Sequence, residues 1–352
     1  MTDMETLDKI LIEMLAQGGS DLHLSVGSVP KIRIDGEIYP LGEKSFDAEQ
    51  LEAMLKAVTP EARWARFEES NDADLAYEIP GSARFRMNLF RNHNGVASVL
   101  RQIPTRIASI DELGLPQALK DVASYSDGLV LVTGPTGSGK STTLAAIINH
   151  INENSQKQII TLEDPVEFTH EDKRSTIIHR EVSVHTKSFA RGLRGAIRAD
   201  PDVILIGEMR DMETIRLALN CAAMGMLVFA TVHTNNATKT IDRLIDAFPA
   251  AEQNQTRIML ADCLRGVVSQ LLCQKVDGGR EAVHEILLTH SSLPNSIRKG
   301  ALSNVRNIID QNAERGMISM DASLIKLLND GVISKKEAYM KAIDKTRFQL
   351  QD

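Results

Sequence analysis

Hydrophobic and polar residues follow two different patterns along this chain of 352 residues. Up to Pro104, short alternating runs typical of strands are separated by turn residues such as Asp35-Gly36 and Asn94-Gly95. Two helical stretches lie among them, over residues 7–17 and 48–58. This pattern predicts a small α+β domain built on an antiparallel sheet.

From Gly128 onward, apolar strands alternate with amphipathic helices. Strands are expected over residues 129–133, 158–162, 203–206 and 227–232, with helices after Ser141 and over residues 189–198 and 212–223. Such alternation predicts a mostly parallel sheet covered by helices. Beyond Asp246 the pattern predicts a largely helical region, in which Ser334 and Glu337 form a capping box.

The predicted organisation is therefore two domains, which the length also favours. The first covers residues 1–104, a linker rich in turn residues covers 105–116, and the second domain covers 117–352. Residues 217–238 lack Lys, Arg, Asp and Glu, but they include Asn220, Gly225 and His233, which hydrocarbon would penalise. A helix, a glycine break and a strand are expected there, with no membrane insertion and no signal peptide.

The strongest local motif follows the strand at residues 129–133. It reads Gly134-Pro135-Thr136-Gly137-Ser138-Gly139-Lys140-Ser141 and fits the phosphate-binding P-loop at every fixed position. A chance glycine-rich turn is disfavoured, because a strand precedes the motif and a helix follows it. The residues expected to bind ATP are Thr136, Gly137, Ser138, Gly139, Lys140, Ser141 and Thr142. Lys140 would reach the β- and γ-phosphates, and the Ser141 hydroxyl would ligate Mg²⁺.

Three further predicted strands end in residues capable of chemistry. Glu208 follows the strand at 203–206 and is a candidate magnesium-side acid, with a surface salt bridge as the alternative. Glu163 ends the strand at 158–162 in a group of acids that suits water or metal handling, although a solvated loop would tolerate the group. His233 follows the strand at 227–232 and could detect the γ-phosphate or bond only its own loop.

Arginines form a second class of candidates. Arg84 and Arg86 point to one face of their predicted strand and are a plausible source of an arginine finger. Arg191, Arg194 and Arg198 share a helical face and could grip phosphate or a neighbouring subunit, although solvent exposure is the usual outcome for such a stripe.

Composition limits the function classes. The formal net charge is −7, which disfavours a protein whose main task is to grip nucleic acid. The three cysteines, Cys221, Cys263 and Cys273, show neither metal-ligand spacing nor a disulfide framework.

Taken together, these motifs resemble the retraction ATPases of type IV pili (the PilT family), within the larger group of secretion-type motor ATPases. The resemblance covers essentially the whole length. Its blocks are Gly19-Ser20-Asp21-Leu22-His23-Leu24, Arg84-Phe85-Arg86-Met87-Asn88, the P-loop, Leu162-Glu163-Asp164-Pro165-Val166-Glu167-Phe168, Gly207-Glu208-Met209-Arg210-Asp211 and His233-Thr234-Asn235-Asn236-Ala237.

The resemblance implies an N-terminal PAS-like lobe and a RecA-like ATPase lobe, assembled as a homohexamer. It implies Glu163 as the base that activates water, Glu208 as the magnesium-side acid and His233 as the γ-phosphate sensor. Arg86 and Arg101 are the implied arginine fingers. The implied partners are the inner-membrane pilus platform protein and the pilus base, with a paralogous pilus ATPase as a further candidate, at the cytoplasmic face of the membrane.

The chain also departs from the family pattern. Met226 stands where the family usually has a first histidine, so sensing is expected to fall on His233. Residues 296–300 preserve the family's retraction-associated helix motif only in part. An accessory retraction paralogue therefore stays open as an alternative, as does a related motor for secretion or DNA uptake. A non-catalytic ring partner is disfavoured, because no P-loop or acid-box residue is lost.

Overall fold

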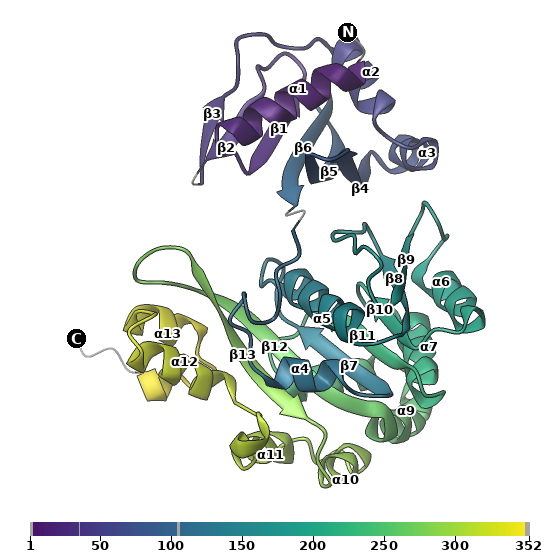
Figure 1. The fold of residues 1–352 in the computed structure, drawn as a ribbon, viewed down its shortest axis with the longest axis vertical. Helices are drawn as coiled ribbons and strands as arrows, with labels where there is room; N and C mark the ends of the chain where they lie inside the picture. Colours follow the sequence, from purple (N-terminus) through teal and green to yellow (C-terminus); the bar gives the residue numbers. More distant parts are fainter. Residues whose placement is uncertain (1–2, 35, 104–105, 349–352) are drawn as a thin grey trace. The chain divides into compact units, whose positions relative to one another are not determined.

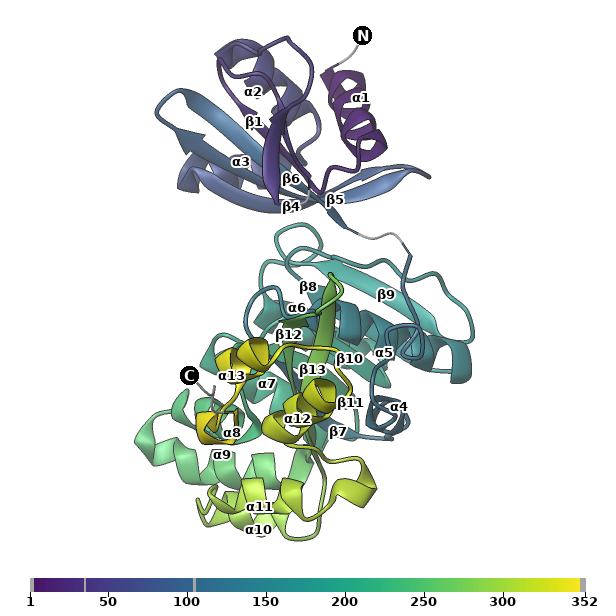
Figure 2. The same cartoon turned by 90° about the vertical axis from the view of Figure 1, so that its left-hand side faces the viewer.

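A computed structural model describes residues 3–34, 36–103 and 106–348. The chain forms two compact units: unit 1 comprises Met1–Arg106, Glu163–Thr169 and Arg180–Ser188, and unit 2 comprises Ile107–Leu162, His170–His179 and Phe189–Asp352. Pro104, the predicted end of the first domain, and the first residue of the predicted linker lie outside the described residues. Figures 1 and 2 show the path of the chain through both units.

Unit 1 is built on a six-stranded sheet in the order β3-β2-β1-β6-β5-β4. All five neighbouring pairs are antiparallel, so the predicted antiparallel sheet is confirmed. α1 packs on α2 and β1, and α2 packs on β6. The elements are α1 (Asp3–Ala16), β1 (Asp21–Ser25), β2 (Lys31–Ile34), β3 (Glu37–Pro40), α2 (Ala48–Ala57), α3 (Glu61–Ser70), β4 (Asp72–Ile79), β5 (Ala83–Asn92) and β6 (Gly95–Ile103).

Of the two later helices of unit 1, the sequence predicts α2 but not α3. Asp47 caps α2: its carboxylate accepts the Gln50 amide, while the Gln50 side chain accepts the Asp47 amide, which is a complete capping box. The sequence pattern does not predict α3. Its inward face carries Arg63 beside Trp64 and Phe67, and a buried arginine reads as polar in a hydrophobicity pattern.

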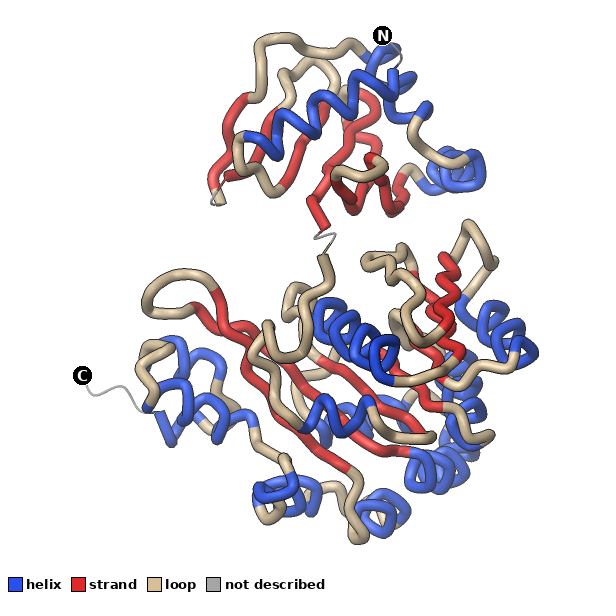
Figure 3. Tube along the Cα trace, in the orientation of Figure 1, coloured by secondary structure: helices blue, strands red, loops and turns tan. Residues whose placement is uncertain are grey.

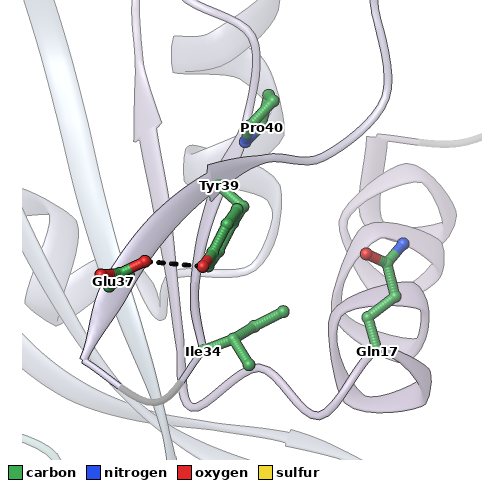
Figure 4. A pocket seen from close by; sticks show the side chains of 5 residues that line it. All are labelled: Gln17, Ile34, Glu37, Tyr39 and Pro40. Carbon is green, nitrogen blue, oxygen red and sulfur yellow. Dashed lines mark hydrogen bonds between the residues drawn. The ribbon is translucent and has the colours of Figure 1, made fainter.

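Strand β3 lies at the edge of this sheet and all four of its residues are exposed. The Tyr39 hydroxyl donates a hydrogen bond of 2.7 Å to Glu37. Tyr39, Glu37, Ile34, Pro40 and Gln17 line a surface hollow here (Figure 4). None of the predicted site residues lines this hollow.

Unit 2 is built on a seven-stranded sheet in the order β13-β12-β7-β11-β10-β8-β9. The pairs among β7, β11, β10 and β8 are parallel, as predicted. Strand β12 also pairs with β7 in parallel, and β13 runs antiparallel to β12. Helices cover the sheet (Figure 3). The strands are β7 (Gly128–Thr133), β8 (Gln158–Glu163), β9 (Thr176–Glu181), β10 (Val203–Ile206), β11 (Leu227–Val232), β12 (Leu264–Gln274) and β13 (Arg280–Leu288).

The helices of unit 2 are α4 (Ala118–Ala123), α5 (Lys140–Asn154), α6 (Phe189–Ala196), α7 (Met212–Ala223), α8 (Ala237–Asp246), α9 (Ala250–Cys263), α10 (Leu293–Arg298), α11 (Asn304–Asp310), α12 (Met320–Asn329) and α13 (Lys335–Lys341). The three helices predicted within the alternating region correspond to α5, α6 and α7. In the stretch tested as a membrane span, α7, Gly225 and β11 follow one another, which confirms the predicted helix, glycine break and strand. Among the described residues, no helix is both long and apolar enough to cross a bilayer.

The prediction of a largely helical region beyond Asp246 is wrong for β12 and β13. These two strands pair over nine residues, and β12 also pairs with β7. Short apolar runs of this kind do not distinguish a strand from a buried helix, so long-range pairing decides. Strand β9 is a further strand that the pattern does not predict.

The predicted capping box of α13 forms only in part. The Ser334 hydroxyl accepts the Glu337 amide at 3.1 Å, as expected. The Glu337 carboxylate, however, accepts the backbone N–H of Gln274 at 3.1 Å, which fastens α13 to the end of β12. A tertiary contact therefore takes the place of the second, local hydrogen bond.

Two buried histidines of unit 2 make its stability depend on pH. Burial lowers the pKa of His284 from 6.5 to about 4. Burial, with His179 and Lys173 nearby, lowers the pKa of His170 to about 4. The unfolded chain takes up a proton at each histidine near pH 6.5, but the folded chain does not. The free energy of unfolding should therefore fall from pH 6.5 towards 4, by about 1.4 kcal/mol per pH unit for each histidine.

Urea denaturation of the wild type and of His284→Leu across this pH range checks the prediction. The slope of the unfolding free energy against pH reports how many protons are taken up on unfolding, and in the variant this number should be smaller by about one. An unchanged slope would contradict it.

Candidate functional site

The P-loop lies between a buried strand and a long helix, as the sequence predicts. All six residues of β7 are buried, and Lys140 is the first residue of α5. Residues 135–137 at the tip of the loop are exposed, as are Ser141 and Thr142 in the first turn of α5. The first N–H groups of a helix have no partner within it, so this turn can offer donors to an anion.

Two glycines are required because the loop lies against Gln270 of β12. Gly134 has φ +149°, and a Cβ there would meet the Gln270 carbonyl oxygen at 2.3 Å. Gly139 has φ +87°, and a Cβ there would meet the side-chain Nε2 of Gln270 at 2.8 Å. Both positions combine a positive φ with a close approach, so only glycine fits without displacing the loop.

Lys140 is folded over its own loop. Its Nζ donates hydrogen bonds of 2.9 Å to the carbonyl oxygens of Gly134 and Pro135, and only 9% of the residue is exposed. The ammonium group is therefore held at the mouth of the loop. A lysine in this position can act on phosphate as a point charge.

Gln270 of β12 is a residue that sequence analysis missed. It is 2% exposed; its Nε2 donates to the Ser138 carbonyl at 2.7 Å, and its Oε1 accepts the Thr143 hydroxyl at 2.7 Å. One side chain thus joins the loop to the first turns of α5. The run Val267-Val268-Ser269-Gln270 carries a strand signal, but only the pairing of β12 with β7 shows that Gln270 reaches the P-loop.

The topology brings the other predicted strand ends to the same edge of the sheet. Strands β7, β11, β10 and β8 are consecutive neighbours and all parallel. Carboxyl ends of parallel strands share one edge, which is where ligands bind in open α/β sheets. The P-loop, His233, Glu208 and Glu163 follow or end these four strands.

Glu208 and His233 lie close together at this edge. His233 Nε2 is 3.7 Å from Glu208 Oε2, and Arg210 Nε is 2.7 Å from Glu208 Oε1. The backbone on either side of Glu208 is held by the Gly207 amide, which donates to the Leu162 carbonyl, and by the Met209 amide, which donates to the Thr231 carbonyl. Arg210 was part of the recognised motif, but its pairing with Glu208 was not expected.

Glu163 and Asp164, the first two acids at the end of β8, differ in the contacts that they make. Glu163 is the last residue of β8, and its carbonyl accepts the Val182 amide at 2.8 Å. Within unit 1, Asp164 and Glu181 each accept a hydrogen bond of 3.0 Å from Arg63, whose side chain is 1% exposed. Asp164, expected only as one of a group of acids, is thus part of a partly buried ion-pair network around Arg63.

The two predicted arginine fingers are neighbours in unit 1. Arg86 of β5 and Arg101 of β6 lie directly opposite each other in the register. Arg86 contacts Asp74 at 3.3 Å and Glu167 at 3.4 Å, and Arg101 contacts Asp21 at 2.6 Å. Opposed like charges destabilise a sheet, and these acids offset the repulsion. Their side chains are 42% and 70% exposed.

Burial and hydrogen bonding set the ionisation of Asp21. Burial raises its pKa, but hydrogen bonds from Ser20 and Arg101 with the charge of Arg101 outweigh that effect, so its pKa lies below 3.8. The ion pair with Arg101 is therefore formed at neutral pH.

Of the arginines predicted to share a helical face, Arg194 pairs with Glu213 of α7 on an exposed surface.

The family model described as type II/IV secretion system protein matches residues 3–338. The chain belongs to this family. It is 44% identical over 336 residues to the type IV pilus retractation ATPase PilT of Pseudomonas aeruginosa, covering 94% of this chain and 98% of that protein. It is 44% identical over 314 residues to the twitching motility protein of Neisseria gonorrhoeae, covering 89% of this chain and 84% of that protein.

Solved structures agree with the sequence comparison. The fold matches a crystal structure of the pilus retraction motor PilT with bound ADP at a TM-score of 0.88 and 38% identity, covering 99% of this chain and 98% of that one. The resemblance to the retraction ATPases is confirmed, and so are the mixed α/β fold and the prediction of an ATPase of this family.

We predict that replacing Gln270 weakens nucleotide binding by this family member. Gln270→Leu leaves the Ser138 carbonyl and the Thr143 hydroxyl without their buried partner, which costs on the order of 1–3 kcal/mol for each unsatisfied group. ADP affinity should fall about tenfold or more in a calorimetric titration.

Gln274→Leu is the matched control, since Gln274 lies exposed on the same strand. Its ADP affinity should equal that of the wild type. If Gln270→Leu bound ADP as tightly as wild type, Gln270 would not position the loop.

Proposed function

We propose that this chain is an ATP-hydrolysing hexameric motor that drives type IV pilus retraction, the disassembly of pilin that underlies twitching motility. The observation that carries the proposal is its 44% identity, over nearly the whole of both chains, with a pilus retractation ATPase. An intact P-loop on β7 and α5, with Glu208 and His233 at the same sheet edge, supports ATP as the energy source.

The nucleotide site is proposed at residues 134–142. The N–H groups of Thr136, Gly137, Ser138, Gly139, Lys140, Ser141 and Thr142 would surround the phosphates, at the positive end of α5. The Lys140 ammonium would leave the carbonyls of its own loop and bind the β- and γ-phosphates. The exchange replaces two neutral acceptors with charged oxygens, so it favours the bound state.

The residues present fit Mg²⁺ as the metal of this site. Ser141 offers an exposed hydroxyl beside the loop, and Glu208 offers a carboxylate; both are the hard oxygen donors that Mg²⁺ prefers. No group of three or more His, Cys, Asp or Glu side chains arranged for a metal occurs in the part of the chain that the structure describes. That suits a metal held largely by phosphate and water. When bound, Mg²⁺ would neutralise charge on the phosphate oxygens.

Glu163 is proposed as the general base. Its carboxylate at the end of β8 would take a proton from the water that attacks the γ-phosphate. Glu163 ends β8, which lies next to β10 in the sheet, and Glu208 follows β10; this shared edge supports Glu163 as the acid of its group that acts on water. His233, 3.7 Å from Glu208, is proposed to detect the γ-phosphate in place of the paired histidines usual in the family.

Arg86 and Arg101 are proposed as arginine fingers. Their exposure and their position opposite each other in the sheet support a role on a ligand outside unit 1. In the proposed cycle, a PAS-like lobe (residues 1–104) closes on a RecA-like lobe (residues 117–352) about the linker 105–116, and reopens after hydrolysis. Six subunits would transmit this motion to the membrane platform protein at the pilus base, from the cytoplasmic side.

We predict that Glu163→Gln abolishes ATP turnover but retains ATP binding and hexamers, because the amide keeps the shape of the side chain and cannot accept the proton. The loss should be about a hundredfold or more in kcat. Lys140→Ala should instead lose nucleotide binding. Phosphate release and equilibrium nucleotide binding separate the two variants, and robust turnover in either would refute the assigned roles.

The motor function is tested in the cells that make the pilus. Deleting the gene should leave long pili and no twitching, and expression of the wild type but not of Glu163→Gln should restore motility. Normal retraction in the deletion strain would overturn the proposal.

We predict that Arg86→Ala lowers kcat by about a thousandfold if Arg86 stabilises the transition state, with KM for ATP changed far less. Arg91→Ala is the matched control, since Arg91 is an exposed arginine on the same strand. Equal kcat values for the two variants would exclude Arg86 as a finger.

A further inference from the structure

A buried carboxylate in β13 has no part in the chemistry described above. Glu285 lies opposite Ser269 of β12 and is 6% exposed. A buried carboxylate is unfavourable unless it accepts hydrogen bonds. Its Oε1 accepts the Ala237 amide at 2.8 Å, and its Oε2 accepts the Met320 amide at 3.5 Å.

Both donors are the first residues of helices. Ala237 begins α8 and Met320 begins α12, and both are 0% exposed. The first N–H groups of a helix have no acceptor within it. Asn236 caps α8 through the Lys239 amide, and Ser319 at the start of α12 makes no side-chain cap. Glu285 therefore accepts the first N–H of each of two helices, groups that the side chains of Asn236 and Ser319 do not reach.

The α8 side leads directly to the candidate nucleotide site. Ala237 follows the loop of residues 233–236, which leaves the carboxyl end of β11. The hydroxyls of Thr234 and Thr240 are 2.7 Å apart, and the Thr240 hydroxyl also donates to the Asn236 carbonyl. The His233 loop is thus fixed to the first turn of α8, so the position of that turn sets the position of His233.

The α12 side leads to the C-terminal helices α11, α12 and α13, which we call the C-terminal cluster. Asp321, 1% exposed, accepts the Ile343 amide at 2.8 Å and contacts Arg306 of α11 at 3.3 Å. Just before α12, Ile318 and Ile286 exchange backbone hydrogen bonds of 2.8 and 3.2 Å. The start of α12 is therefore joined to both β13 and the rest of the cluster.

We propose that Glu285 is a positioning residue that joins the His233 loop to the C-terminal cluster, so that nucleotide at the site and the start of α12 respond to each other. The inference rests on the proposed function, because it assumes that ATP binds beside His233. The bond to α8 (2.8 Å) is shorter than the bond to α12 (3.5 Å), so Glu285 holds the start of α8 more tightly than the start of α12.

Electrostatics fit a shared carboxylate. Burial is the largest influence on Glu285 and raises its pKa, and Asp321 adds to this effect. The Ala237 and Met320 amides and Arg306 act in the opposite direction. Loss of either amide partner would leave the charge less compensated, so the two helix starts are not independent.

Two variants separate the two bonds. In Glu285→Gln the single oxygen can keep the short bond to Ala237, but the amide NH₂ then faces the Met320 N–H, and the bond to α12 is lost. In Glu285→Ala both bonds are lost. Glu281→Gln, on the less buried part of the same strand, is the matched control.

The readouts are ATP turnover and hydrogen–deuterium exchange of the α12 amides 320–323, with and without a non-hydrolysable ATP analogue. In the wild type and in Glu281→Gln, the analogue should change this exchange. Glu285→Gln should bind the analogue and hydrolyse ATP within about twofold of wild type, yet lose the change. Glu285→Ala should lower kcat about tenfold or more with KM for ATP little changed, since the P-loop is untouched.

Three outcomes would overturn the inference: α12 amides of the wild type that do not respond to nucleotide, a normal response in Glu285→Gln, or wild-type kcat in folded Glu285→Ala. A merely structural role would lower stability and leave the nucleotide response of Glu285→Gln intact. If Glu285→Ala fails to fold, the Glu285→Gln exchange result decides. A wild-type protein that hydrolyses no ATP would instead refute the proposed function.

Discussion

Parallel pairing of four buried strands is the constraint on which the candidate site depends. Strands β7, β11, β10 and β8 are consecutive neighbours in the sheet, and the register of each pair fixes where each strand ends relative to the next. A P-loop, a histidine and two glutamates, spread over a hundred residues of sequence, therefore come to one edge. The apolar strands supply the rigidity, because nearly every residue in them is buried.

Polar side chains inside this apolar framework fix the loops that the strands carry. Gln270 and Glu285 lie on the neighbouring strands β12 and β13, and each has two partners on different elements. A buried polar group with both partners satisfied defines one geometry, whereas an apolar residue would tolerate several. The strands that complete the sheet thus also hold the P-loop and the start of α8.

Arginine has a comparable role in unit 1, through charge. Arg63 is buried and donates to Asp164, Glu181 and the Val182 carbonyl, so the segments 163–169 and 180–188 are held to α3. Arg86 and Arg101 are exposed and keep acids beside them. Arg63 thus stabilises the internal structure of this unit, whereas Arg86 and Arg101 remain accessible to solvent. The family resemblance singled out the accessible pair, whereas spacing pointed to Arg84 and Arg86, and neither gave any sign of the buried Arg63.

The sequence by itself determined the P-loop, most of the strands and helices up to β11 (α3 and β9 excepted), and the candidate residues at the strand ends. These signals are local: glycines that a phosphate loop needs, periodicity of apolar residues, and polar residues that end apolar runs. Tertiary structure alone decided that residues 264–288 form strands, that Gln270 contacts the P-loop, and that Glu285 lies between two helix starts. Each of these depends on partners far away in sequence. The residues adjacent in sequence do not determine which distant group will accept or donate a hydrogen bond.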